Sequence, residues 1–179
     1  MTPLLILDLD NTLIFGTAEP LARPADWRVG PYHIYARSHL ARFFQRVTAH
    51  YRLAVWTAAT QLYAEEVVKH SFPPDARLEF LWSRGHCKPR MDIETREEYW
   101  LKDLTKLRRH GHDLDRILFV DDTAKNLSRN YGNLIAIAPY SGETEDNELM
   151  HLASFLESVT KNASLRKLEK RGWRKRTEG

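Results

Sequence analysis

Two aspartates near the start of the chain, Asp8 and Asp10, are the residues whose type and spacing most clearly suggest chemistry. They come directly after the apolar run Leu4–Leu7, and so short an apolar run is typical of a strand buried on both faces of a parallel sheet. Residues two apart in an extended segment point the same way. The two carboxylates would therefore repel unless a cation or a proton intervened. The pattern predicts a metal site, or an acid/base pair with a nucleophile within reach.

Four further polar residues stand at comparable places in the chain. Thr57 follows one strand-like run, and Asp121 and Asp122 follow another, while Lys102 lies at what reads as the start of a short helix. The carboxyl ends of parallel strands meet at one edge of a sheet, so these groups can converge. Each residue alone has an ordinary explanation as a helix cap, a surface lysine or the start of a loop. All of these residues in this order are far less common by chance than any one of them alone.

This ordered set resembles the four signature motifs of the haloacid dehalogenase superfamily of phosphohydrolases. Within it, the chain is similar to the RNA polymerase II C-terminal-domain phosphatase-like (NLI-interacting factor) family. The segments that carry this resemblance are Trp56-Thr57-Ala58-Ala59, Leu101-Lys102-Asp103-Leu104, Val120-Asp121-Asp122-Thr123 and Asn133-Leu134-Ile135. The similarity covers roughly residues 4–159 and leaves a basic C-terminal end outside it.

The resemblance implies a phosphatase that works through an aspartyl-phosphate intermediate. Asp8 would be the nucleophile, and Asp10 would act as general acid and then as general base. Mg²⁺ would be held by Asp8, the backbone carbonyl of Asp10 and Asp121. Thr57 would hydrogen-bond a phosphoryl oxygen, and Lys102 would offset the charge that the nucleophile and the phosphate share.

Two further residues are candidates by the same resemblance. Asp122 would orient Lys102 or a metal-bound water. Arg37 is a candidate substrate contact, because Arg37-Ser38 stands where relatives have Arg-Pro.

The resemblance also bears on the substrate. In the superfamily, open sites without a large cap admit bulky substrates, which favours a phosphorylated protein and a serine/threonine phosphatase. A nucleic-acid 3′-phosphate, a phosphotyrosine or a small-molecule phosphate is the alternative with the same chemistry. A non-enzymatic binding module is a third, disfavoured because all the expected active-site residues are present.

The elements that must position these residues indicate an α/β fold. Strand-like runs occur at Leu4–Leu7, Arg52–Trp56, Leu78–Trp82, Ile117–Val120 and Leu134–Ile137. Apolar spacing predicts amphipathic helices, the first capped by Ser38, over Ser38–Ala49, Thr60–His70 and Glu145–Val159. Strands that alternate with helices predict a Rossmann-like parallel sheet flanked by helices, which the resemblance identifies as a haloacid dehalogenase-like core.

Two segments break this alternation. Residues 14–36 contain three prolines and a strand-forming end, Tyr32–Ala36, and predict a hairpin-like flap over the site. Residues 72–100 predict a small insertion, and we expect no large cap. The expected organisation is one domain over residues 1–160 followed by a basic tail over residues 161–179.

Composition limits the class of protein. A chain of 179 residues, 42% hydrophobic and 28% charged, fits one soluble domain with a real core. No stretch reaches the length of a membrane span and no secretory signal precedes the first strand. The single cysteine, Cys87, excludes an internal disulfide. We therefore expect a cytoplasmic location, or a nuclear one in a eukaryote, without membrane contact.

The net charge of +3 hides an uneven distribution. Residues 161–179 carry eight basic and two acidic side chains, whereas the rest carries 19 basic and 22 acidic ones. Such a tail could contact nucleic acid. The favoured interpretation is a solvated end that frays in solution, so that its deletion leaves activity intact.

Overall fold

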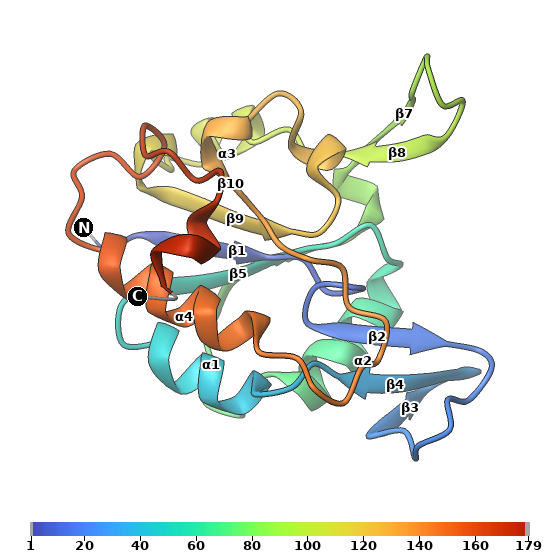
Figure 1. The fold of residues 1–179 in the computed structure, drawn as a ribbon. Coiled ribbons are helices and arrows are strands. Elements are labelled where there is room, and N and C mark those ends of the chain that lie inside the picture. Colours follow the sequence, from blue (N-terminus) through green and yellow to red (C-terminus); the bar gives the residue numbers. More distant parts are fainter. Residues whose placement is uncertain (1, 178–179) are drawn as a thin grey trace.

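The computed structural model describes residues 2–177, and a five-stranded parallel sheet forms its centre (Figure 1). The strand order is β10-β9-β1-β5-β6. The strands are β1 (Leu4–Leu7), β5 (Arg52–Trp56), β6 (Leu78–Trp82), β9 (Ile117–Asp121) and β10 (Leu134–Ala136). Because β1 lies in the middle, its carboxyl end opens between those of β5 and β9. The predicted Rossmann-like sheet is confirmed.

Helices cover both faces of this sheet (Figure 1). One core layer contains residues of α1 (Leu40–Val47), α2 (Gln61–Ser71) and α4 (Glu148–Val159), whereas the other contains Leu107 of α3 (Thr105–Arg109). Alternate residues of β1 enter the two layers, so the strand is buried on both sides, as its apolar run predicts. Within residues 2–177, no helix is both long and apolar enough to span a bilayer.

Short 3₁₀ turns link several of these elements. They are η1 (Arg84–His86), η2 (Leu114–Arg116), η3 (Ala124–Leu127), η4 (Tyr131–Asn133) and η5 (Trp173–Arg176). Turns η1 and η3 follow β6 and β9 at the carboxyl edge of the sheet, so they lie beside the predicted site.

The start of α1 differs from the prediction. Its N-cap is His39, in the left-handed conformation with φ of 65°, and no side-chain hydrogen bond caps the helix. The hydroxyl of Ser38 donates instead to the carbonyl of Thr144, 3.1 Å away. The predicted cap by Ser38 is therefore wrong, because a partner far along the chain engages that hydroxyl.

The flap is a small sheet rather than one hairpin. It contains β2 (Ile14–Thr17), β3 (Trp27–Val29) and β4 (Tyr32–Ala36), antiparallel in the order β2-β4-β3. It lies against α2, where Trp27 stacks on His70 with ring centroids 5.8 Å apart. The flap therefore forms one wall beside the carboxyl end of β1.

The predicted insertion over residues 72–100 is too wide. Strand β6 belongs to the central sheet, and the part that projects is an antiparallel ribbon of β7 (Lys88–Met91) and β8 (Glu98–Leu101) (Figure 1). An ion pair of 2.5 Å between Asp92 and Lys125 joins the tip of this ribbon to η3. The ribbon stands on the side of the site opposite the flap.

The tail packs against the body. Leu165 is fully buried, and its backbone N–H donates to the carbonyl of Asp115 at 2.8 Å. Trp173 is also buried, and its indole N–H donates to the carbonyl of Ala136 on β10 at 2.8 Å. The expectation of a frayed end is wrong for residues 161–177, because these two apolar side chains anchor the segment.

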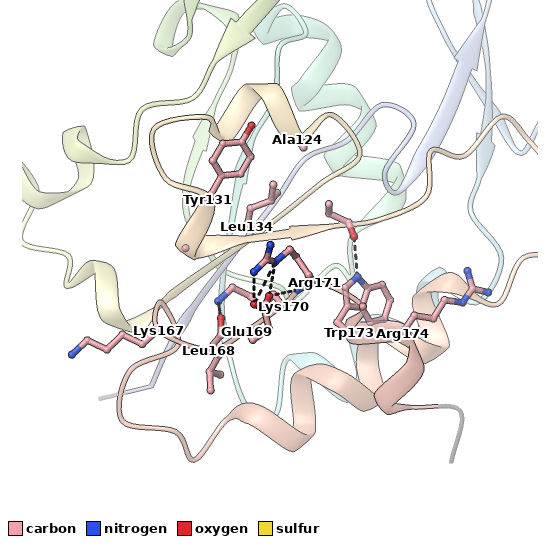
Figure 2. A pocket seen from close by; sticks show the side chains of 13 residues that line it. Ala124, Tyr131, Leu134, Lys167, Leu168, Glu169, Lys170, Arg171, Trp173 and Arg174 are labelled. Carbon is pink, nitrogen blue, oxygen red and sulfur yellow. Dashed lines mark hydrogen bonds and ion pairs between the residues drawn. The ribbon is translucent and has the colours of Figure 1, made fainter.

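A cavity of about 730 Å³ lies between the tail and the outer edge of β10 (Figure 2). Leu134 and Ala136 contribute apolar surface, and Lys167 and Arg171 are among the basic residues around it. The ammonium of Lys170 donates to three carbonyls of the tail, and burial lowers the pKa of this lysine to about 8. Basic residues thus surround a hollow here, and the contact with nucleic acid stays a prediction.

The packing of the tail predicts a loss of stability when its anchor is removed. Trp173→Ala should lower the free energy of unfolding by about 3–5 kcal/mol, because it leaves a cavity and an unpaired carbonyl. Urea denaturation followed by circular dichroism measures this. Arg171→Ala is the control, since its side chain is 92% exposed and should change stability little. An unchanged midpoint for Trp173→Ala would show that the tail is detached in solution.

Candidate active site

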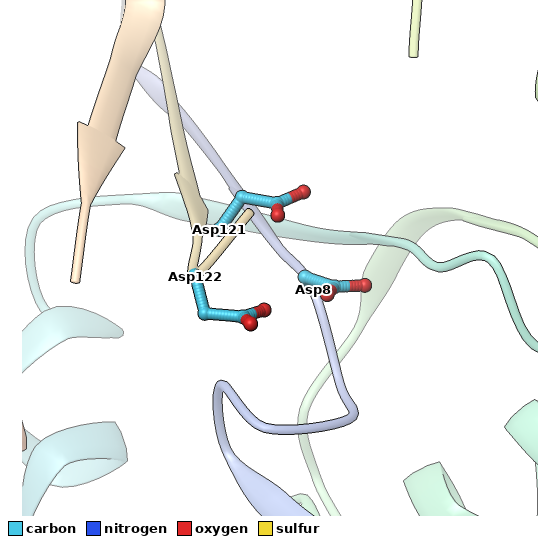
Figure 3. Close-up of side chains that lie close together, drawn as sticks. All are labelled: Asp8, Asp121 and Asp122. Atoms are coloured by element: carbon cyan, nitrogen blue, oxygen red, sulfur yellow. The ribbon is translucent and has the colours of Figure 1, made fainter. Parts of the chain in front are cut away.

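Three carboxylates converge at the carboxyl ends of β1 and β9 (Figure 3). Oxygens of Asp8, Asp121 and Asp122, which we call the aspartate cluster, all lie within 4.8 Å of one another. Asp121 is fully buried, Asp8 nearly so, and Asp122 half-buried. The backbone N–H of Asp8 donates to the carbonyl of Val120 at 3.0 Å, so strand pairing itself sets this convergence.

Lys102 bridges two members of the aspartate cluster. Its Nζ lies 2.8 Å from Asp8 Oδ1 and 2.7 Å from Asp121 Oδ2, and its side chain is fully buried. Burial alone would lower the pKa of an ammonium, but Asp121 and Asp8 outweigh it and raise the pKa of Lys102. The lysine therefore stays charged. It directly follows β8 rather than starting a helix, since α3 begins at Thr105.

Hydrogen bonds from neighbouring residues also fix the carboxylates of Asp121 and Asp122. Asp121 accepts from the side chain of Asn126 at 3.2 Å and from the backbone of Thr123 at 2.9 Å. Asp122 accepts from the hydroxyl of Thr12 at 3.2 Å. Asp8 and Asp121 hold Lys102, so Asp122 is not placed to orient that lysine, and its predicted role in orienting a metal-bound water stays a prediction.

The aspartate cluster fits a divalent cation. Burial raises the pKa of Asp121, against the effect of Lys102, and burial and Asp8 raise the pKa of Asp122. Three carboxylates with one ammonium leave an excess of negative charge, and carboxylate oxygens are the ligands that Mg²⁺ prefers. Asp8, Asp121 and Asp122 are placed to hold such an ion. A contribution from the Asp10 carbonyl stays a prediction.

The carboxyl group of Asp10 lies outside the aspartate cluster. It accepts a hydrogen bond from the hydroxyl of Tyr63, with 2.7 Å between the oxygens. Burial raises the pKa of Asp10 to about 6, with Tyr63 opposing and Asp8 reinforcing this shift. A carboxyl group with such a pKa can both give and take a proton near neutral pH.

A pocket of about 330 Å³ opens in front of Asp8 and Asp10. Thr57 lines it from the end of β5, and the backbone N–H of Ala59 donates to its hydroxyl oxygen at 3.1 Å. The hydroxyl thus keeps its own proton for another acceptor. The pocket combines two carboxyl groups, a hydroxyl and, behind Asp8, the ammonium of Lys102.

Comparison with known proteins identifies the family. A family model described as NLI interacting factor-like phosphatase matches residues 3–166. The chain belongs to this family. It is 28% identical over 163 residues to CTD small phosphatase-like protein 2 of Dictyostelium discoideum, covering 87% of the chain and 27% of that protein.

Two further relatives are similarly distant. CTD small phosphatase-like protein 3 of Caenorhabditis elegans is 28% identical over 162 residues, which are 87% of the chain and 53% of that protein. The mitochondrial import inner membrane translocase subunit TIM50 of Arabidopsis thaliana is 28% identical over 160 residues, 89% of the chain and 38% of that protein. The chain thus spans about a quarter to a half of these relatives.

Solved structures show the same fold. The structure of Fcp1, an essential RNA polymerase II CTD phosphatase, superimposes with a TM-score of 0.67 at 20% identity over 88% of the chain and 62% of that structure. Fission yeast Fcp1-R271A bound to beryllium fluoride gives a TM-score of 0.59 at 20% identity over 98% of the chain and 61% of that structure. The haloacid dehalogenase-like fold is therefore confirmed.

Arg37 does not line the pocket. It is buried, and its guanidinium binds both carboxylate oxygens of Asp146, at 3.0 and 2.8 Å. It also donates to the carbonyls of Thr12 and Ala138, at 3.1 and 2.9 Å. The predicted substrate contact is wrong: in this member of the family, Arg37 ties together the loops that precede α1 and α4.

Sequence reasoning missed Gly16 and three large side chains that line the pocket. Tyr63 comes from α2 and Tyr32 from the flap, and their rings meet edge to face with centroids 5.8 Å apart. Arg84 comes from η1, where its guanidinium lies 4.9 Å from the centroid of the Trp100 ring and donates to the carbonyl of Ala58 at 2.6 Å. The basic residues Arg84, Lys88 and Arg90, which lie close together in the predicted insertion, are the sequence signal for this rim.

Proposed function

We propose that the chain is a Mg²⁺-dependent phosphomonoester hydrolase that forms an aspartyl-phosphate on Asp8 and acts on phosphoserine or phosphothreonine in proteins. The observation that carries this proposal is the fully buried Lys102 between Asp8 and Asp121, behind a pocket that also holds Asp10 and Thr57. Membership of the NLI interacting factor-like phosphatase family supports the same chemistry.

In the first step, a carboxylate oxygen of Asp8 attacks phosphorus. The bond from this oxygen to phosphorus forms, the bond from phosphorus to the leaving oxygen breaks, and Asp10 gives its proton to the leaving group. The hydroxyl of Thr57 donates to a phosphoryl oxygen, and Lys102 offsets the charge that accumulates on Asp8 and the phosphate. A divalent cation on the aspartate cluster would neutralise further phosphate charge.

In the second step, water attacks the phosphorus of the aspartyl-phosphate. Its proton passes to Asp10, the bond between phosphorus and Asp8 breaks, and inorganic phosphate leaves. Both aspartates return to their starting states. The pKa of about 6 for Asp10 suits this cycle, because the same group must be an acid in one step and a base in the next.

The shape of the site supports the proposed class of substrate. The wall of the pocket is formed by the flap on one side and by Arg84 at the base of the ribbon, with no large cap over it in residues 2–177. A phosphate on a side chain of a bulky protein can reach such a site, and Arg84 offers a cation for an acidic neighbourhood. The cytoplasmic or nuclear location stays a prediction, since one relative is a mitochondrial import subunit.

A screen of kcat/KM tests the proposed function. Phosphoserine and phosphothreonine peptides, phosphotyrosine peptides, 3′-phosphorylated oligonucleotides and sugar phosphates are compared in the presence of Mg²⁺. We expect the first class to give the highest values. A preference for oligonucleotides would support the nucleic-acid alternative, and no turnover above that of Asp8→Asn would indicate a binding module.

Removal of divalent cations should abolish turnover. Without a cation, three crowded carboxylates repel a phosphate, so dialysis against EDTA should reduce hydrolysis of an aryl phosphate to background and excess Mg²⁺ should restore it. Thermal unfolding in EDTA is the control that the chain stays folded. Full activity after EDTA treatment would contradict the metal assignment.

A further inference from the structure

We propose that Tyr63 is a positioning residue for Asp10, and that Gly16 is glycine because any side chain there would displace the Tyr63 hydroxyl. The inference rests on the proposed function, since it takes Asp10 as the acid and base of phosphate transfer. It assigns a task to two residues that lie outside the motifs that carry the chemistry in the sequence.

Tyr63 is held so that its hydroxyl meets one oxygen of Asp10. The two oxygens are 2.7 Å apart, and the residues come from different elements, α2 and the loop after β1. On its other side the ring of Tyr63 contacts Tyr32 of β4 edge to face, at 5.8 Å between centroids. Helix and flap together therefore fix the direction of the hydroxyl.

Gly16 on β2 leaves the space that this hydroxyl occupies. A Cβ at position 16 would lie 2.5 Å from the Tyr63 hydroxyl oxygen, 3.2 Å from Ile34 Cδ1 and 3.7 Å from Asp10 Oδ1. A contact of 2.5 Å is too close for carbon and oxygen, so the hydroxyl would have to move. Gly16 is not among the glycines with positive φ. Space, rather than backbone conformation, accounts for glycine here.

The hydrogen bond has a chemical consequence for Asp10. With Oδ1 engaged by Tyr63, the carboxyl plane is fixed and Oδ2 is left to exchange the proton with the leaving oxygen. Asp10 becomes a carboxylate when it gives up this proton, and a hydrogen bond to a charged acceptor is stronger than one to a neutral acceptor. Tyr63 therefore favours the proton-transfer step itself. It keeps its own proton, because burial raises the pKa of the phenol.

This task predicts a dependence on the leaving group. An alkoxide from phosphoserine is a poor leaving group and needs the proton of Asp10, whereas p-nitrophenolate leaves without one. Loss of the Tyr63 hydroxyl should therefore slow the first step, the release of the leaving group, selectively for the peptide. A residue that merely binds substrate would change KM, and a residue needed only for folding would affect both reactions equally.

The experiment measures the rate of leaving-group release in a single turnover, which reports the first step alone, for a phosphoserine peptide and for p-nitrophenyl phosphate in Tyr63→Phe, Gly16→Ala and the double variant. We expect each single variant to lower this first-step rate for the peptide about tenfold or more, as a lost hydrogen bond to a charged group does. The first-step rate for p-nitrophenyl phosphate should fall less than about threefold. The double variant should match the single ones, because both remove the same contact. Tyr131→Phe, at an exposed ring outside the pocket, is the matched control.

The outcomes separate this inference from the proposed function. Equal losses in the first-step rate for the two substrates, an unchanged first-step rate for the peptide in Tyr63→Phe, or additive effects in the double variant would overturn the inference while the wild type still hydrolyses both substrates. A wild type that hydrolyses neither would overturn the proposed function and the role of Asp10 with it. Thermal unfolding checks each variant, and Tyr63→Phe decides the result if Gly16→Ala does not fold.

Discussion

Replacing Asp8 with asparagine is expected to reduce hydrolysis of both a phosphoserine peptide and an aryl phosphate to background. The amide of asparagine cannot attack phosphorus, so no covalent intermediate forms whatever the leaving group. Loss of the nucleophile in a covalent mechanism costs on the order of 10⁴- to 10⁶-fold in kcat. Steady-state assays at a high enzyme concentration, compared with a blank without enzyme, measure the fall in kcat.

Trapping the intermediate provides the direct control for this result. Wild-type protein denatured during turnover of a radiolabelled substrate should carry label on Asp8, and Asp8→Asn should carry none. The variant should stay folded, because Lys102 keeps its ion pair with Asp121 at 2.7 Å. Turnover near the wild-type value in Asp8→Asn would reject the aspartyl-phosphate.

Replacing Asp10 with asparagine should lower kcat for the phosphoserine peptide by about 10²–10⁴-fold, the usual effect of removing a general acid or base. The variant should still form the aspartyl-phosphate from p-nitrophenyl phosphate, whose leaving group needs no proton. It should then hydrolyse the intermediate slowly, so labelled protein should accumulate. A variant that turns over the peptide as fast as wild type would exclude Asp10 as the acid.

The raised pKa of Asp10 also gives this residue a signature in pH profiles. The first step needs protonated Asp10, and the protonated fraction falls as pH rises through about 6. Therefore kcat/KM for the peptide should decline above this pH, while the value for p-nitrophenyl phosphate should stay flatter. The decline should be absent in Asp10→Asn. A flat peptide profile in the wild type would contradict the assignment.

The central sheet could be predicted from the sequence because its strands are short and mainly apolar runs. The predicted bounds of β1, β5 and β6 coincide with the observed ones, and β9 extends one residue further, to Asp121. The same reasoning placed Asp8, Thr57 and Asp121 together, since parallel strands deliver their carboxyl ends to one edge. For these three residues, their positions directly after predicted parallel strands are enough to predict that they lie close together.

The contacts of Tyr63 and Arg37 could not be predicted in this way. Tyr63 fits the apolar face of a helix equally well, and only the fold reveals that its hydroxyl reaches a carboxyl group 53 residues earlier. Arg37 stands beside a motif, but its partner Asp146 lies 109 residues away. Periodicity indicates which face of an element is buried, and it carries no information on which polar atom meets which.

The tail shows a second limit of composition. Its eight basic residues suggest a solvated end, yet Leu165 and Trp173 decide its position, because burial of two large apolar side chains outweighs the hydration of their neighbours. Charge counts describe the surface that a segment presents. They do not indicate whether that segment packs against the rest of the protein.

The ribbon of β7 and β8 leaves the body and returns to it at two buried points. Cys87, buried before β7, directs its thiol toward the carbonyl of Thr57, and Lys102 follows β8 with its backbone N–H bound to the carbonyl of Asn126 at 2.7 Å. Both points are adjacent to residues that would handle phosphate, whereas residues 89–98 between them are exposed apart from Asp92. We therefore expect that an exchange confined to residues 89–98 changes the surface beside the pocket and leaves both buried points in place.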